Sequence, residues 1–333
     1  MLRTTLLVLL ACIVIAKCEI YTSVLPRMVG GQDTVAGFAP SVVSIRIPRH
    51  VANAPETFCG GTIINLNHIL TSVQCVHNET FQLLNPSEFR IVAGDLNIML
   101  PSFRRFTTSA SHIYTHPSYT VNPRSNDIAV MRTSTPFPSP HNTIDFSVRS
   151  THVLPNGHTC RFVGWSSATT TGILNPVQQF IAANIFDRRD CNAANVHRGL
   201  VLENMICAGS LAATPSVCTG NLGGGLFCQV GTVWQLTGVL SFGIGCGATN
   251  TPGVYTQVRF FEAWINQQLT RTDATPAGSL VTHSWSLLWS YILAKRFWWK
   301  DVIKSQLKNR VTKKRQNVGF SAKHRCLLNL YTL

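Results

Sequence analysis

The chain has 333 residues and a mass of 36.7 kDa, and its 28 Lys+Arg against 14 Asp+Glu give a formal net charge of +14. A hydrophobic content of 45% with only 13% charged residues excludes a chain that is disordered or fibrous throughout. Taken over the whole chain, the positive charge points to an anionic partner such as nucleic acid, a heparin-like polymer or a membrane.

The positive charge is concentrated near the C-terminal end of the sequence. Residues 28–273, called the body below, contain 14 Arg, no Lys and 12 acidic residues, a net charge of +2. Residues 274–333 contain 7 Lys, 4 Arg and the single acid Asp301, a net charge of +10. The net charge of the body therefore gives no reason to expect that it binds nucleic acid or heparin.

The N-terminal residues have the pattern of a secretory leader. The apolar run Leu6–Ala16 follows an early Arg, is too short to span a bilayer and ends at a small residue. We expect a signal peptide over residues 1–16 (to about residue 18), a propeptide over residues 19–27, and an extracellular product. An N-terminal anchor helix is the alternative, but it would need a longer run than Lys17 allows.

The body shows recurrent short β-rich runs between turn residues, which favours an all-β sandwich or barrel. In chain order these runs are Ser41–Ile47, Gly61–Asn65, Phe89–Ala93, Thr232–Ser241 and Gly253–Val258. A single helix is predicted at the end of the body, over Phe260–Thr270, from an apolar stripe at three-to-four spacing: Phe261, Trp264, Ile265 and Leu269.

The chain contains 11 cysteines, of which an even set of eight lies in the body. In a secreted chain this set predicts four disulfides, although spacing alone does not determine which cysteines pair. Cys12 and Cys18 belong to the leader region, and Cys326 lies in the basic C-terminal segment. The eight are Cys59, Cys75, Cys160, Cys191, Cys207, Cys218, Cys228 and Cys246.

Six segments of the body occur in the order typical of one family. They are Arg27-Met28-Val29-Gly30-Gly31, Thr71-Ser72-Val73-Gln74-Cys75, Ser125-Asn126-Asp127-Ile128-Ala129, Gly220-Asn221-Leu222-Gly223-Gly224-Gly225, Ser241-Phe242-Gly243 and Thr251-Pro252-Gly253-Val254-Tyr255. On these motifs the body resembles the trypsin/chymotrypsin family of secreted serine proteases over essentially all of residues 28–273. The resemblance implies two six-stranded antiparallel barrels, a C-terminal helix, and an active site in the cleft between the barrels.

The resemblance also identifies which residues hold the three positions of the family's catalytic triad. The His position holds Gln74, the Ser position holds Leu222, and only the Asp survives, as Asp127. A Gln amide does not titrate near neutral pH and cannot act as a general base, and Leu has no atom that can attack a carbonyl. Because triad members act as a unit, we expect no proteolysis by the family mechanism.

Other residues near these positions are weak candidates to restore catalysis. His77 follows Cys75, whereas the catalytic position precedes it, and Ser216 and Thr219 match the specificity pocket and its rim.

We expect Asp127 to be a structural carboxylate that accepts hydrogen bonds from Gln74 and Ser241. An active endopeptidase with altered catalytic groups and chymotrypsin-like specificity remains the alternative function.

Activation and substrate-binding positions carry over with changes of their own. Arg27 matches the activation cleavage site, with Met28 as the new terminus, and the neutral Asn221 replaces the acid that pairs with the new ammonium. A buried ammonium needs a charged partner, so the activation switch is expected to be weak or absent. The alternative is that Asn221 still accepts a hydrogen bond from the new terminal amine and activation is little changed. The oxyanion-hole backbone corresponds to Gly220 and Leu222.

The specificity pocket is expected to be open and uncharged, with Ser216 at its base and Gly243 and Gly253 as its walls, so that it suits an apolar or aromatic side chain. Alternatively, these glycines serve only turns. The disulfides that the resemblance implies use all eight body cysteines: Cys59–Cys75, Cys160–Cys228, Cys191–Cys207 and Cys218–Cys246. Asn78, in the sequon Asn78-Glu79-Thr80, is a candidate glycosylation site.

Residues 274–333 match nothing in the family. Their basic and Trp-bearing composition fits a membrane-surface or polyanion-binding arm, a marginal membrane anchor, or an extension of the gene prediction that is not part of the protein. The sequence as a whole indicates a secreted, zymogen-like, monomeric serine protease homologue without catalysis. It would bind extracellular proteins, for example in an immune cascade, without nucleic acid, cofactor or metal.

Overall fold

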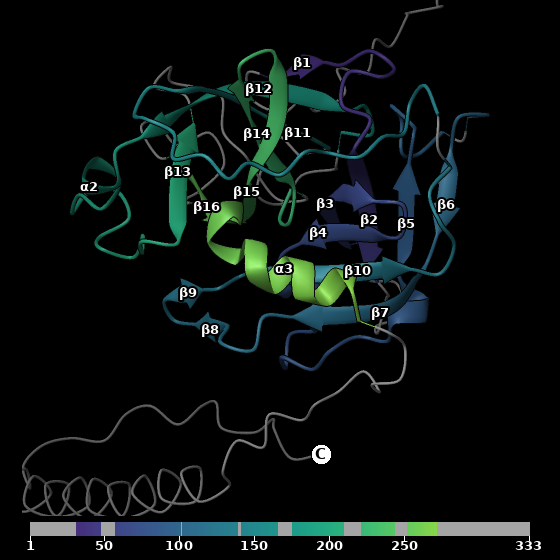
Figure 1. Ribbon diagram of the computed structural model, residues 1–333, viewed down its shortest axis with the longest axis horizontal. Coiled ribbons are helices and arrows are strands. Elements are labelled where there is room, and N and C mark those ends of the chain that lie inside the picture. Colours follow the sequence, from purple (N-terminus) through teal and green to yellow (C-terminus); the bar gives the residue numbers. More distant parts are fainter. Residues whose placement is uncertain are drawn as a thin grey trace, which may run out of the picture. The chain divides into compact units, whose positions relative to one another are not determined.

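The computed structural model (Figure 1) describes seven stretches of the chain, all within the compact unit that spans residues 1–277. They are residues 31–47, 57–100, 102–138, 141–165, 175–209, 221–243 and 252–271. Within these stretches no helix combines the length and hydrophobicity of a membrane-spanning segment.

The N-terminal half of this unit is one antiparallel sheet in the order β6-β5-β2-β3-β4-β10-β7. Its strands are β2 (Val42–Ile47), β3 (Thr57–Asn65), β4 (His68–Thr71), β5 (Arg90–Ala93), β6 (Phe106–Thr108), β7 (Ala110–Thr115) and β10 (Ala129–Thr133). The edge strands β6 and β7 are separated only by Ser109, so they form one bent strand that pairs with β5 at one end and β10 at the other. The sheet therefore closes into a six-stranded barrel.

The C-terminal half is a second antiparallel sheet, which closes through the pairing of β12 with β13. The ring consists of β11 (Thr159–Gly164), β12 (Gln179–Phe186), β14 (Gly225–Val230), β15 (Val233–Phe242), β16 (Gly253–Gln257) and β13 (Met205–Gly209). The short β1 (Gln32–Asp33) pairs with β12 from outside the ring. The two six-stranded barrels confirm the predicted fold class.

The remaining elements are short. A hairpin of β8 (Thr120–Val121) and β9 (Arg124–Ser125) precedes β10, and α2 (Arg188–Cys191) precedes β13. The 3-10 turns are η1 (Val73–Val76), η2 (Pro86–Glu88) and η3 (Val258–Phe261), and η3 leads into α3 (Glu262–Leu269). The predicted C-terminal helix is thus present, although its first turn is a 3-10 turn.

A shared hydrophobic core holds the two barrels and α3 together. Ile128 and Val130 from the first barrel pack in one cluster with Val239 from the second barrel and with Ile265 from α3. Phe261 and Ile265 are buried, and Trp264 and Leu269 pack against the same cluster. The apolar stripe read from the sequence is therefore the face that α3 (Figure 1) presents to the barrels.

The structure also contains strands that the sequence patterns missed. β12 alternates buried and more exposed residues along its length, which is the period-two signal of a half-buried strand. β14 is continuously buried over its first four residues, so no alternation marks it. Such a fully buried strand has no periodicity to distinguish it from other apolar segments.

Candidate functional site

The three triad positions come from separate elements that meet where the barrels join. Gln74 lies in η1, Asp127 lies just before β10, and Leu222 lies before β14. The Gln74 side chain reaches Asp127, and the N–H of Gly60 in β3 donates to the Leu222 carbonyl at 2.8 Å. Tertiary packing thus assembles residues that lie up to 148 positions apart (74 to 222) in the sequence.

Asp127 is fully buried and accepts four hydrogen bonds. Its Oδ1 accepts from the backbone N–H of Val73 (2.7 Å) and of Gln74 (3.3 Å). Its Oδ2 accepts from Gln74 Nε2 (2.5 Å) and from Ser241 Oγ (2.6 Å). Both oxygens are therefore satisfied, and all four donors are uncharged groups.

Burial has the largest effect on the pKa of the Asp127 carboxylate. Removal from water raises the pKa of Asp127, and the hydrogen bonds from Ser241, Gln74 and Val73 lower it by a smaller amount. The pKa of Asp127 is therefore higher than that of an ordinary aspartate. The four donors make the buried charge tolerable, which fits the structural role expected for Asp127.

Gln74 uses its amide nitrogen entirely in internal contacts. Nε2 donates to Asp127 Oδ2 and also to the backbone carbonyl of Ser241 at 2.9 Å. An amide nitrogen is a donor only, because its lone pair is delocalised into the carbonyl group and does not accept a proton near neutral pH. The Gln74 side chain thus donates a hydrogen bond to Asp127, as a histidine at this position would, but it cannot act as a base.

Leu222 presents only carbon atoms at the position of the nucleophile. Its side chain is half-buried and packs against the core of the first barrel, which includes Cys75. The carbonyl of Asn221 accepts from the N–H of Gly224 at 2.9 Å, so Leu222 and Gly223 form the tip of a tight turn.

Glycines allow this turn to approach β3 closely. Gly223 has φ +77°, and a Cβ there would lie 2.7 Å from the Gly60 carbonyl oxygen. A Cβ on Gly60 would in turn lie 2.7 Å from the Cα of Gly224. Side chains are excluded at both points by contact between the two backbones, and that contact positions Leu222.

Asn221 differs sharply from Asp127. It is 1% exposed, and neither Nδ2 nor Oδ1 has a hydrogen-bond partner among the described residues. Its Oδ1 faces the backbone of Gly164, where a Cβ would approach it to 2.8 Å. A buried amide without partners costs free energy. Arg27 and Met28, the predicted activation site, lie outside the described residues.

His77 is directed into its own turn. Its Nδ1 lies 2.9 Å from the carbonyl oxygen of Val73, and its ring stacks on Phe81 with centroids 4.3 Å apart. Burial lowers the pKa of His77, so the neutral ring is favoured. Both contacts lie within residues 73–81, and neither involves Asp127.

The sequence motifs did not indicate the aromatic and cationic groups around these positions. Tyr119 stacks on Phe81 at 5.3 Å, and burial, with the nearby Asp127 charge, raises the pKa of Tyr119 to about 12. The guanidinium of Arg124 lies 6.0 Å from the ring centre of Phe242. Nothing in the local sequence predicts these contacts, because they join segments that are distant in the chain and meet only in the fold.

The positions of the predicted specificity pocket are only partly described. Gly243 is exposed, and a Cβ there would meet only the Cα of Gly253, at 4.0 Å. Gly243 and Gly253 therefore lie close together, as two walls of one pocket would. The predicted pocket base, Ser216, and the oxyanion-hole residue Gly220 lie outside the described residues.

Three of the predicted disulfides are present. The structure joins Cys59 to Cys75, Cys160 to Cys228, and Cys191 to Cys207. A disulfide of this kind contributes roughly 2–4 kcal/mol by constraining the unfolded chain. The fourth predicted pair, Cys218–Cys246, falls outside the described residues.

The predicted glycosylation site forms a compact turn. Asn78 Oδ1 accepts from the N–H and the hydroxyl of Thr80, at 3.1 and 2.8 Å, and from the N–H of Gln82 at 2.8 Å. Thr80 and Gln82 are exposed, and Asn78 itself is half-buried. The sequon thus lies on a surface turn next to His77.

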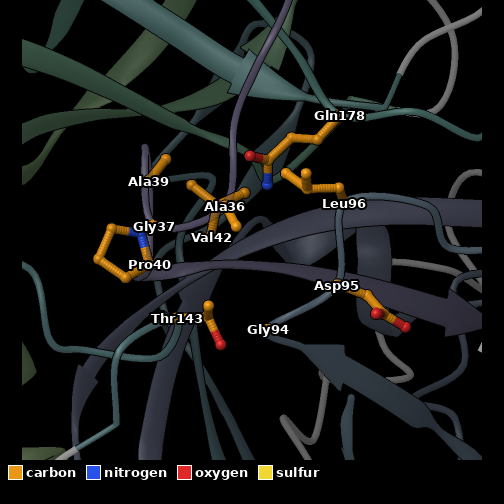
Figure 2. Close-up of a pocket in the computed structure, with 10 residues that line it drawn as sticks. All are labelled: Ala36, Gly37, Ala39, Pro40, Val42, Gly94, Asp95, Leu96, Thr143 and Gln178. Atoms are coloured by element: carbon orange, nitrogen blue, oxygen red, sulfur yellow. The ribbon is translucent and has the colours of Figure 1, made fainter. Parts of the chain in front are cut away.

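Two other features of the described residues are separate from the triad positions. A shallow pocket between the segment 36–42 and the loop 94–96 (Figure 2) contains none of the predicted site residues. Cys191, His197 and Cys207 have potential metal-ligand atoms within 4.8 Å of one another. The two sulfurs of this group are joined in a disulfide, and His197 Nε2 lies 2.8 Å from the carbonyl oxygen of Pro252.

Comparisons with known proteins agree with this architecture. The sequence model of the trypsin family matches residues 28–265. Human transmembrane protease serine 5 is 30% identical over 246 residues, which cover 72% of this chain and 51% of that protein. Chicken trypsin I-P1 is 30% identical over 242 residues (72% and 88%), and rat serine protease 1 is 28% identical over 244 residues (73% and 90%). The chain thus spans about half the length of the human relative.

Proposed function

Because the chain belongs to the trypsin family of serine proteases, we propose that it is a member without triad catalysis, which acts by binding other proteins. The single observation that carries this proposal is the state of Gln74. Its amide nitrogen donates to Asp127 and to the Ser241 carbonyl, in the place where a catalytic base would act. No proton acceptor stands there to activate a nucleophile.

The nucleophile position leads to the same conclusion independently. A half-buried Leu222 that packs on the first barrel's core has no heteroatom with which to form an acyl intermediate. Restoring only one of the two groups would leave the other missing. Losing either member removes nearly all of triad catalysis.

The cleft is expected to persist as a binding surface. The close contact of the turn around Gly223 with β3 and the satisfied Asp127 both preserve the backbone around the cleft without any catalytic group. A retained pocket bounded by Gly243 and Gly253 would accept an apolar or aromatic side chain. The partner is an extracellular protein, such as a component of a proteolytic or immune cascade.

Secretion, processing and modification complete the proposal. The leader over residues 1–16, three disulfides and the surface sequon at Asn78 are consistent with an extracellular, glycosylated monomer. With the neutral Asn221 in place of an acid, cleavage after Arg27 would not order the loops as an ammonium–carboxylate pair does. The intact mass of the secreted product, before and after glycosidase treatment, tests the glycan, the cleavage and the presence of residues 274–333.

The decisive experiment is labelling of the purified protein, cleaved after Arg27, with a fluorophosphonate probe. We expect no covalent labelling and no turnover of aromatic peptide substrates. The double variant Gln74→His with Leu222→Ser is the positive control, and each single variant is the matched negative control. Labelling of the unaltered protein would overturn the proposal and favour the alternative, an endopeptidase with altered catalytic groups.

A further inference from the structure

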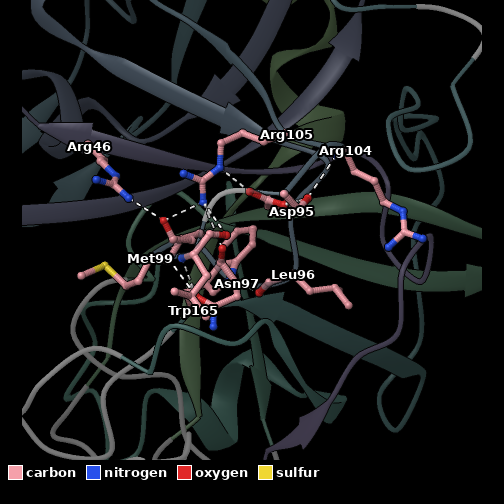
Figure 3. A network of polar contacts seen from close by, with 11 residues as sticks. Arg46, Asp95, Leu96, Asn97, Met99, Arg104, Arg105 and Trp165 are labelled. Atoms are coloured by element: carbon pink, nitrogen blue, oxygen red, sulfur yellow. Dashed lines mark hydrogen bonds and ion pairs between the residues drawn. The ribbon is translucent and has the colours of Figure 1, made fainter.

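Two exposed loops of the first barrel are held by different kinds of contact. The loop between β5 and β6 is held by a network of polar contacts around the ion pair of Asp95 and Arg105 (Figure 3). The turn over residues 77–83, called the sequon turn, is held instead by stacked aromatic rings. The sequon turn begins three residues after Gln74 and therefore borders the triad positions.

The stacked rings fix the sequon turn beside Asp127. The ring centroids of His77 and Phe81 lie 4.3 Å apart and those of Phe81 and Tyr119 lie 5.3 Å apart, with nearly parallel planes. Phe81 is 45% exposed and has φ +61°, in the left-handed region that a bulky residue rarely adopts. Burial and the nearby Asp127 charge raise the pKa of Tyr119, so the stack ends close to the Asp127 carboxylate.

The start of the sequon turn is tied to the same carboxylate through the backbone. His77 Nδ1 lies 2.9 Å from the Val73 carbonyl oxygen, and the Val73 N–H donates to Asp127 at 2.7 Å. Within the turn, the N–H of Asn78 donates to the carbonyl of Gln82 at 2.9 Å. Both ends of the turn are thus tied to residues around Asp127, and Asn78 lies between them.

The hydrogen bonds of Asn78 are compatible with an oligosaccharide on its amide nitrogen. Its Oδ1 accepts from Thr80 and Gln82, and these bonds do not involve Nδ2. Nδ2 donates to the Oε1 of the exposed Gln82 at 3.2 Å. In N-glycosylation Nδ2 forms a bond to the anomeric carbon of a lipid diphosphate-linked oligosaccharide, the bond from that carbon to the diphosphate breaks, and Nδ2 releases one proton. The N–H that remains can keep the contact with Gln82.

A glycan on the sequon turn would occupy space at the rim of the cleft. An N-linked glycan is bulky and hydrated, and the fixed turn prevents its attachment point from moving away. A folded partner needs about 800 Å² of contact and would have to spread over this rim, whereas an extended segment needs only the cleft itself. We infer, on the basis of the proposed binding function, that the glycan on Asn78 restricts the cleft to extended segments of partner proteins.

Thiol labelling in the cleft of the full chain tests this inference. Gly243→Cys places a thiol at the exposed pocket wall, where a Cβ meets only the Cα of Gly253, at 4.0 Å. The small probe is N-ethylmaleimide, the large probe is a small globular protein that carries one maleimide, and the reactivity of the unaltered protein is subtracted. Removal of the glycan with peptide N-glycosidase should raise the labelling rate of the large probe by about fivefold or more, a steric barrier of about 1 kcal/mol. The rate with N-ethylmaleimide should not change.

Further variants control for the enzyme treatment and for the position of the thiol. Thr80→Ala removes the single sequon of the chain and should label like the deglycosylated protein. Val233→Cys carries an exposed thiol at the opposite end of β15 from Phe242, about 30 Å away, and its labelling should not change. Arg124→Cys, at an exposed position of the hairpin beside Phe242, is a second cleft probe if Gly243→Cys disturbs the fold.

The possible outcomes separate the glycan from the other parts of the proposed function. An intact mass without a glycan would overturn this inference and the proposed glycosylation, and would leave the proposed loss of catalysis untouched. A glycan whose removal does not affect the large probe would overturn the inference alone. Labelling by N-ethylmaleimide that also requires removal of the glycan would show that the cleft is closed to extended segments as well, which would equally overturn it.

Discussion

Asp127 and Asn221 are both at most 1% exposed, yet their surroundings are opposite. Asp127 accepts four hydrogen bonds, whereas the amide of Asn221 has no partner among the described residues. By the family resemblance, the residue beside Asp127 is changed, because Gln74 stands where the family has a histidine. Asn221 is itself the changed residue, because it stands where the family has an acid. A replacement that keeps a donor, as Gln74 does, preserves the site around it.

The two sites show which replacements the fold can compensate with hydrogen bonds. Gln74 supplies an N–H where the imidazole supplied one, so the buried carboxylate keeps its hydrogen bond. Asn221 keeps the shape of an aspartate but not its charge, and no described group compensates. Asp127 therefore keeps its hydrogen bonds, whereas Asn221 has neither a charge nor a side-chain hydrogen bond among the described residues. Four measurements test this difference between Asp127 and Asn221.

The largest effect is expected from Asp127→Ala. Removing the carboxylate leaves three donors without this acceptor, the N–H groups of Val73 and Gln74 and the hydroxyl of Ser241, while Gln74 Nε2 keeps the Ser241 carbonyl. This should lower the free energy of unfolding by about 3–5 kcal/mol. Urea denaturation measures this change. Glu203→Gln, at an exposed position, is the control and should stay within about 0.5 kcal/mol of the unaltered protein. If Asp127→Ala lowers the free energy of unfolding no more than the control does, Asp127 does not stabilise the fold.

The next effect concerns the residue that compensates. Gln74→Ala should cost about 1–3 kcal/mol, because Asp127 Oδ2 and the Ser241 carbonyl each lose a donor. Gln74→His should be better tolerated, since the imidazole can restore one donor. The exposed Gln267→Ala serves as the control. If alanine and histidine are equally destabilising, the Gln74 hydrogen bonds contribute little.

At the second site the sign should reverse. Asn221→Leu removes two buried polar atoms without partners and should raise the stability by about 1 kcal/mol. Thermal unfolding of the variant and of the unaltered protein, cleaved and uncleaved after Arg27, measures the difference. A loss of stability in the cleaved form alone would show that the new N-terminus bonds to Asn221 and that this amide does have a partner.

The smallest effect is a pH dependence. Burial raises the pKa of Asp127, so the native state holds this proton more tightly than the unfolded state. By linkage, the stability contributed by Asp127 rises as pH falls from 7 towards 4 and is lost as pH rises through the folded pKa. The stability of the unaltered protein relative to Asp127→Asn should therefore increase on acidification. A decrease would indicate that the hydrogen bonds outweigh burial.

Much of the fold could be predicted from the sequence, because its signals are local. The runs at 41–47, 89–93 and 232–241 lie almost on β2, β5 and β15, and the stripe at 261–269 lies on η3 and α3. The closure of each barrel could not be predicted from such runs. It depends on the bend at Ser109 and on the pairing of β12 with β13, and neither feature leaves an apolar or period-two pattern in the sequence.

The candidate site divides in the same way. The identity of Gln74 and Leu222 determines, from the sequence by itself, that the family's base and nucleophile are missing, because an amide does not take up a proton near neutral pH and a hydrocarbon cannot attack a carbonyl. Only the tertiary structure decided that the Asp127 carboxylate is fully hydrogen-bonded, that the Asn221 amide has no partner among the described residues, and that His77 contacts the Val73 carbonyl. Those outcomes depend on donors and acceptors brought together by packing, and a sequence lists the groups without their distances.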